Sequence, residues 1–210
     1  MRRRSVRLAV LSIIAIAAAS CAHPAAVQLA PVRPDDDMLV WAAALDAAFS
    51  HLPASARLMV ASTTQKLPQS GVDLRTWVHG SAVVDSAYLS SLRVRNARAQ
   101  KVAGPFATRL PVQIYDAEAA RKVHATAVPP SDNPFGSTVG IWYARLHKAY
   151  PGVWGLVTLT EPGYSNDRDI AVVYLMSVCS LECGQTELFV LRRTGGGGWR
   201  VIERHLLEVV

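Results

Sequence analysis

Apolar residues recur at helical spacing in several parts of the chain. Between positions 38 and 52 they lie three or four residues apart, which predicts a helix with one apolar face, at Met38, Trp41, Leu45, Phe49 and Leu52. The proline at position 53 ends this helix. The same criterion predicts further helical segments over 81–97, 116–123 and 137–150. Short runs rich in β-branched or apolar residues predict strands over 57–63 and 110–115.

From Val153 onward, apolar runs alternate with turn residues, which is typical of strands. Four such runs cover 153–160, 169–178, 186–193 and 199–210. The short turns between them predict an antiparallel C-terminal meander of about four strands. Glu203 and His205 interrupt the alternation of the last run, which indicates a bulge or a frayed edge. Because the helices precede the meander, we expect an α+β fold with N-terminal helices packed on one face of the sheet.

The N-terminus has the pattern of an export signal. Four arginines, at positions 2, 3, 4 and 7, precede an uncharged run of 12 residues from Leu8 to Ala19. A membrane-spanning helix needs about 20 residues, so this run fits a signal peptide better than a span. Residues 21–36 contain three prolines and show no periodicity, which predicts a tether. The predicted organisation is a signal peptide over 1–20, a tether over 21–36 and a single α+β domain over 37–210.

The residues Ala18-Ala19-Ser20-Cys21 resemble the cleavage box of bacterial lipoproteins, although that box usually has Leu where Ala18 stands. The resemblance implies that Cys21 is acylated, for example with palmitate, and becomes the first residue of the mature chain. Ala22 in place of Asp favours, by resemblance to enteric lipoproteins, the outer membrane facing the periplasm. Ordinary cleavage after Ala22, giving a soluble periplasmic protein, stays the alternative. Both alternatives place the protein in the cell envelope.

Removal of the signal changes the charge of the chain. The signal holds four of the 22 Lys and Arg residues and none of the 16 Asp and Glu residues, so the mature chain has 18 basic and 16 acidic residues, a net +2. This near balance argues against nucleic acid as a partner.

Cys179 and Cys183 form an even pair once Cys21 carries lipid, and an oxidising envelope predicts a disulfide between them. Such a bond would staple a hairpin. The redox and zinc alternatives are weaker, because the spacing is not C-x-x-C and further zinc ligands at suitable spacing are missing.

The segment 150–205 resembles the C-terminal part of a group of uncharacterised bacterial exported proteins. The shared pattern comprises Tyr150-Pro151-Gly152, a Gly-aromatic pair at 163–164, an apolar strand, a cysteine turn and a final hairpin ending in Gly-x-Trp-like residues. The resemblance implies a shared fold and no particular activity.

Candidate chemistry is sparse. Ser165 lacks the second glycine of a G-x-S-x-G nucleophile motif, and the six histidines show no zinc-binding spacing. We therefore predict no cofactor and no metal. Glu203 and His205 lie two residues apart in a predicted strand, so they share a face and could act as an acid/base pair. The alternative is an exposed strand face. Glu161, Asp167 and Asp169 are read as a solvated turn rather than a calcium loop.

Arg93, Arg95, Arg98 and Lys101 form a basic run without any acidic residue between Leu89 and Tyr115. Such a run is usually a solvated helix end, and contact with anionic lipid or lipopolysaccharide beside the anchor is the functional alternative. The sequence as a whole predicts a lipid-anchored envelope protein that binds or scaffolds a partner of unknown identity. An envelope hydrolase that uses Glu203 and His205 is the alternative, and a structural subunit of an envelope complex is a third hypothesis.

Overall fold

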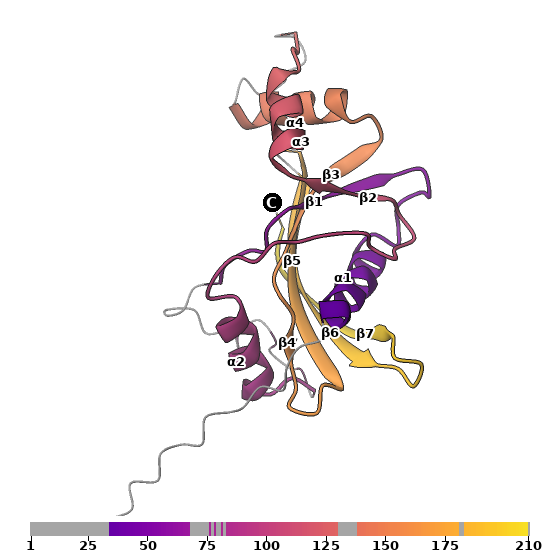
Figure 1. The fold of residues 1–210 in the computed structure, drawn as a ribbon, viewed down its shortest axis with the longest axis vertical. Helices are drawn as coiled ribbons and strands as arrows, with labels where there is room; N and C mark the ends of the chain where they lie inside the picture. The colour runs from indigo at the N-terminus through magenta and orange to yellow at the C-terminus, as the bar shows by residue number, and fades with distance from the viewer. Residues whose placement is uncertain are drawn as a thin grey trace, which may run out of the picture.

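A computed structural model describes residues 34–67, 76, 78, 81, 83–129, 138–180 and 183–209 (Figure 1). The predicted signal peptide, Cys21 and most of the predicted tether lie outside these residues. The described helices are α1 (Pro34–Ala48), α2 (Ser86–Arg95), α3 (Ala117–Ala125) and α4 (Thr138–Ala149). The described strands are β1 (Arg57–Ala61), β2 (Val112–Tyr115), β3 (Val153–Leu159), β4 (Gly163–Tyr164), β5 (Ile170–Ser180), β6 (Cys183–Arg193) and β7 (Trp199–Val209). Each helix and strand predicted from the apolar pattern is present, with its ends moved by a few residues.

The described strands form one mixed sheet of seven strands in the order β2-β1-β3-β5-β6-β7, with β4 paired to β5. Strands β3, β5, β6 and β7 are antiparallel neighbours, as expected. The sheet as a whole is larger than the predicted four-strand antiparallel meander. It is also mixed, because β1 pairs in parallel with both β2 and β3. These two added strands are only five and four residues long, and so short an apolar run carries no information about its neighbours.

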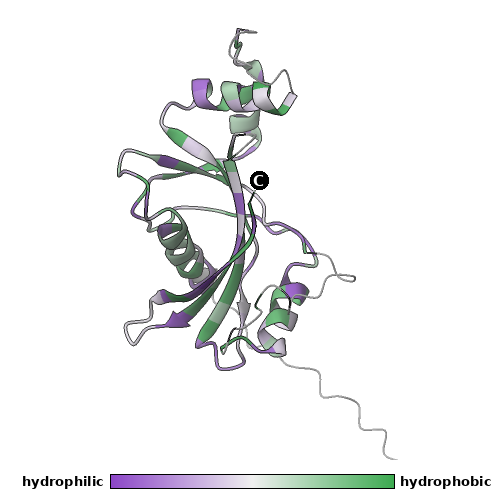
Figure 2. Ribbon diagram, turned by 180° about the vertical axis from the view of Figure 1, so that it is seen from behind, coloured by the Kyte–Doolittle hydropathy of each residue, from purple (hydrophilic) through white to green (hydrophobic). Residues whose placement is uncertain are grey.

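Helices cover both faces of the sheet, so the prediction of one covered face is also wrong. In Figure 1 α1 lies on one side of the curved sheet, where Phe49 packs in one cluster with Val173 and Phe189. On the other side α2 packs against Val172 and Val190, and α3 and α4 cover the far end of that face. The cause lies in the runs Ile170–Val173 of β5 and Leu188–Leu191 of β6, which are apolar and buried at every position and therefore need cover on both faces. Figure 2 shows hydrophobic stretches along the sheet.

Between β3 and β4, residues 160–162 interrupt the strand, and a side chain takes the place of a missing strand partner. Fully buried Asn96, just after α2, donates from Nδ2 to the Glu161 carbonyl oxygen at 2.8 Å and accepts at Oδ1 from the Glu161 N–H at 2.7 Å. Nδ2 also donates to the Leu92 carbonyl at 2.8 Å. Gly163 permits the close approach of β4 to α2, because a Cβ there would lie 2.5 Å from the Leu92 nitrogen.

The last strand contains the predicted bulge. The register of β7 on β6 shifts twice along the strand, which confirms that prediction. Glu203 lies opposite Val190 and His205 lies opposite Leu188. Because Val190 and Leu188 belong to the apolar cluster under α2, Glu203 and His205 lie on the α2 face of the sheet.

Candidate functional site

The densest group of charged side chains lies where α1 begins. The Asp37 carboxylate accepts a hydrogen bond from Arg95 Nη2 at 2.6 Å and another from the Tyr164 hydroxyl at 2.7 Å. Arg95 Nε also lies 3.4 Å from a Glu161 carboxylate oxygen. We call the complete group the α1 clamp, and its members are Asp36, Asp37, Arg95, Glu161, Tyr164, Arg168 and Arg193.

The neighbouring Asp36 continues the α1 clamp toward the end of β6. Its carboxylate lies 2.8 Å from Arg193 Nη2 and 3.9 Å from Arg168 Nη1. The guanidinium groups of Arg95 and Arg168 lie over the Tyr164 ring, at 5.4 and 5.6 Å from its centroid. The clamp thus joins the start of α1 to the end of α2, to β4, to the turn before β5 and to the end of β6.

Burial is the largest influence on the pKa of three side chains in the α1 clamp, Asp37, Glu161 and Tyr164. It raises the pKa of Asp37 above its ordinary value, although the charge of Arg95 and the Tyr164 hydroxyl act in the opposite direction. Burial likewise raises the pKa of Glu161 against the effect of Arg95, and burial together with the Asp37 charge raises the pKa of Tyr164. Three arginines match three carboxylates here, and each described ion pair of these side chains joins two members of the α1 clamp. The arrangement is that of a structural junction rather than of an open ligand site.

The structure brings Glu203 and His205 together, as their spacing predicts. His205 Nε2 lies 3.0 Å from Glu203 Oε2, with side chains that are 20% and 23% exposed. A carboxylate in this position can orient the imidazole. Among the described residues, however, no serine, threonine or cysteine side chain bonds to His205. Within the described residues the pair therefore lacks an adjacent nucleophile, and a hydrolysis that used it would need water as the nucleophile.

Ser165 is a turn residue, as its motif indicated. Its hydroxyl donates to Asp167 Oδ1 at 2.6 Å and accepts from the Ile170 N–H at 3.0 Å, and the side chain is buried. The Ser165 hydroxyl also holds the pKa of Asp167 below its ordinary value. Glu161 points instead to Arg95 in the α1 clamp. Within the described part of the chain, no group of three or more His, Cys, Asp or Glu side chains could hold a metal ion.

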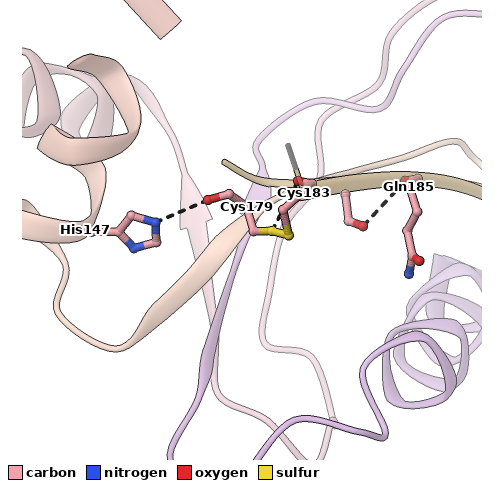
Figure 3. The surroundings of a disulfide bond; sticks show 5 residues. His147, Cys179, Cys183 and Gln185 are labelled. Carbon is pink, nitrogen blue, oxygen red and sulfur yellow. Dashed lines mark hydrogen bonds between the residues drawn. A yellow bond between two sulfur atoms is a disulfide. The ribbon is translucent and has the colours of Figure 1, made fainter. Parts of the chain in front are cut away.

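A disulfide joins Cys179 to Cys183 across the end of the β5–β6 hairpin, as predicted (Figure 3). The two Cα atoms are 5.3 Å apart, within the ordinary range for a disulfide. His147 on α4 points toward this hairpin, with Nε2 3.3 Å from the Cys179 carbonyl oxygen. The covalent staple therefore lies beside α4, at the end of β5 that is opposite the α1 clamp.

The basic run 93–101 does not form one exposed surface. Arg95 turns inward to the α1 clamp and its side chain is only 11% exposed, so it is not available to a lipid surface. Arg93 is half-buried, whereas Arg98 and Lys101 are exposed. Hydrogen-bonding of residues 96–101 with residues 63–67 also brings exposed Lys66 to this surface.

Sequence reasoning missed most of the α1 clamp. Tyr164 bonds to a residue 127 positions away, and Arg193 bonds to Asp36 across 157 positions. No local spacing can reveal such pairs. The one local signal is the acidic run Asp35–Asp37 where the predicted tether meets the predicted helix, because carboxylates favour the start of a helix. That signal does not reveal the arginines that bind them.

Comparison of the chain with protein-family models, curated proteins and solved structures finds no match. None of the helices in the described ranges has the length and apolar content needed to cross a membrane.

Proposed function

We propose that this protein is a lipid-anchored component of the bacterial cell envelope, held at the membrane through an acyl group on Cys21. The observation that carries the proposal is the N-terminal sequence, in which four arginines, an apolar run and Ala-Ala-Ser-Cys follow one another. The disulfide between Cys179 and Cys183 supports it, because disulfides persist in oxidising compartments such as the periplasm. The outer membrane facing the periplasm is the proposed location.

The proposed role of the α+β domain is to bind or scaffold a partner close to the membrane. Pro34, the first residue of α1, follows Cys21 by 13 positions. An extended chain covers at most about 3.5 Å per residue, so the domain begins within about 45 Å of the anchor. The α1 clamp holds this first turn of α1 against α2, β4 and β6. An anchor that restricts the position of α1 would therefore also restrict the position of the sheet.

Labelling of cells with radioactive palmitate tests the anchor. We expect label in the wild-type protein, none in Cys21→Ala, and wild-type protein in the outer-membrane fraction. Label that persists in Cys21→Ala, or a wild-type protein without label in the soluble periplasm, would overturn the anchor. The second outcome would leave export itself intact.

An envelope hydrolase is the second candidate, and the 3.0 Å contact between His205 and Glu203 is the observation that favours it. In this function Glu203 would orient His205, which would take a proton from water that attacks the substrate. A screen of ester, amide and glycoside substrates with wild type and His205→Gln would test it. If the protein is a hydrolase, we expect the wild type to hydrolyse one of these substrates and His205→Gln not to hydrolyse it.

A further inference from the structure

Exposed basic side chains gather on a surface built from two chain segments that lie next to each other. The N–H of Thr64 donates to the Gln100 carbonyl at 2.8 Å, and the N–H of Leu67 donates to the Asn96 carbonyl at 3.1 Å. An isolated bridge also pairs Thr63 with Lys101. Segments 63–67 and 96–101 therefore run antiparallel, and we call their exposed cations the basic patch, which comprises Lys66, Arg98 and Lys101.

The basic patch has no acidic residue along either segment. Neither 62–67 nor 89–115 contains Asp or Glu. The carboxylates of Asp37 and Glu161, which lie near the end of α2, face inward and bind Arg95. Among the described residues no carboxylate forms an ion pair with a cation of the basic patch. Within the described ranges its positive charge is therefore not neutralised by an ion pair.

The basic patch lies near the point where the N-terminal segment enters the domain. Arg95 ends α2 and binds Asp37 in the first turns of α1 at 2.6 Å. The patch begins three residues further on, with Arg98. Helices α3 and α4, by contrast, lie at the other end of the molecule (Figure 1). The basic patch therefore lies at the end of the domain that is joined to Cys21. A membrane that holds Cys21 would be closest to this end of the domain.

We propose that the basic patch rests on the anionic phospholipid headgroups of the membrane that holds the acyl anchor. The inference depends on the proposed anchor and adds the orientation of the domain. Each Lys or Arg near an anionic leaflet strengthens the contact by about fivefold, and the anchor keeps the patch at high effective concentration. Val94, whose side chain is 62% exposed at the end of α2, suits a membrane interface, which accepts an apolar residue beside cations.

The four lysines of the chain make a direct test. Lys66 and Lys101 belong to the basic patch, whereas Lys122 and Lys148 lie on α3 and α4. The full, lipidated chain is reconstituted on vesicles of phosphatidylcholine and on vesicles of phosphatidylcholine and phosphatidylglycerol in equal parts. After flotation, bound protein is treated with a water-soluble amine acylating reagent, and each lysine is followed by mass spectrometry.

On anionic vesicles we expect Lys66 and Lys101 to react about fivefold more slowly than on neutral vesicles, with Lys122 and Lys148 unchanged. High salt should remove the difference. Arg98→Gln should weaken the protection, whereas the matched variant Arg121→Gln, on exposed α3, should not.

Equal reactivity of all four lysines on both vesicles, with normal flotation, would overturn the basic patch and leave the anchor in place. Protection of Lys66 and Lys101 on neutral vesicles as well would overturn the role of anionic headgroups. A chain that floats with neither vesicle would overturn the anchor and, with it, the orientation.

Discussion

The two ends of β5 are held by different chemistry. At its start, beside Ile170, the α1 clamp joins the turn before β5 to α1, α2 and β6 through buried acids and arginines. At its other end, Cys179 is bonded covalently to Cys183 in the next strand. The clamp connects elements that are far apart in the sequence, whereas the disulfide closes a loop of a few residues. The α1 clamp therefore stabilises the tertiary fold, whereas the disulfide stabilises one hairpin.

The largest expected effect comes from removing the central cation of the α1 clamp. Arg95→Leu leaves the carboxylates of Asp37 and Glu161 buried without their cation, and we expect the free energy of unfolding to fall by about 3–5 kcal/mol. Urea denaturation followed by far-UV circular dichroism measures it. The matched control is Arg98→Leu, an exposed arginine three residues on, which should stay within about 0.5 kcal/mol of wild type. Equal losses in the two variants would show that the clamp does not stabilise the fold.

The disulfide should have a smaller effect. The chain-entropy formula gives about 2 kcal/mol for so short a loop, so Cys179→Ala with Cys183→Ala should lower the free energy of unfolding by about that amount. Reductant should destabilise the wild type equally and leave the double variant unchanged. Denaturation curves with and without reductant measure both effects. A loss as large as that of Arg95→Leu would contradict the view that this staple acts on one hairpin.

The same contrast explains what the sequence could predict. The Cys179–Cys183 bond and the Glu203–His205 contact join residues four and two positions apart, within one hairpin and one strand, and local periodicity is enough to find them. The helices and strands followed from apolar spacing for the same reason. The clamp pair of Tyr164 and Asp37 and the parallel pairing of β1 with β3 depend on long-range packing, which a single sequence does not encode in any local spacing.

The sequence contains a pattern that predicts helices on both faces of the sheet. The run Ile170–Val173 is apolar at every position, which indicates a strand buried on both faces. A sheet built on such a strand needs a layer on each side. The prediction of one covered face failed because it followed the order of the elements and gave less weight to this run.

A second way to distinguish the α1 clamp from ordinary surface charge is its response to pH. Burial raises the pKa of Asp37 above its ordinary value of 3.8, so the folded state binds more protons and its stability falls as the pH rises from 3.8 toward the raised value. Asp167 has a lowered pKa through Ser165, so its stabilisation is present above 3.8 and is lost as the pH falls through the lowered value.

Two variants separate these opposite trends. The stability of wild type relative to Asp37→Asn should decrease as the pH rises above 3.8, whereas the stability of wild type relative to Asp167→Asn should increase as the pH rises toward 3.8. Urea denaturation at a series of pH values measures both differences. The same slope in both comparisons would mean that burial does not control the titration of Asp37.

The smallest expected effect concerns Glu203 and His205, which lie on β7, away from both ends of β5. Their side chains are partly exposed, at 23% and 20%, so the pair should contribute at most about 1 kcal/mol. Glu203→Gln should therefore unfold at nearly the same urea concentration as Glu208→Gln, a control on the same strand whose carboxylate is exposed. For a binding or scaffolding protein, both variants should also leave any hydrolysis of test esters unchanged. A fall of about a hundredfold in Glu203→Gln alone, with an unaltered unfolding curve, would be the size of effect that loss of acid/base catalysis produces. That result would place the function on the α2 face of the sheet instead of at the end of the molecule that we propose to face the membrane, and it would make the hydrolase the better hypothesis.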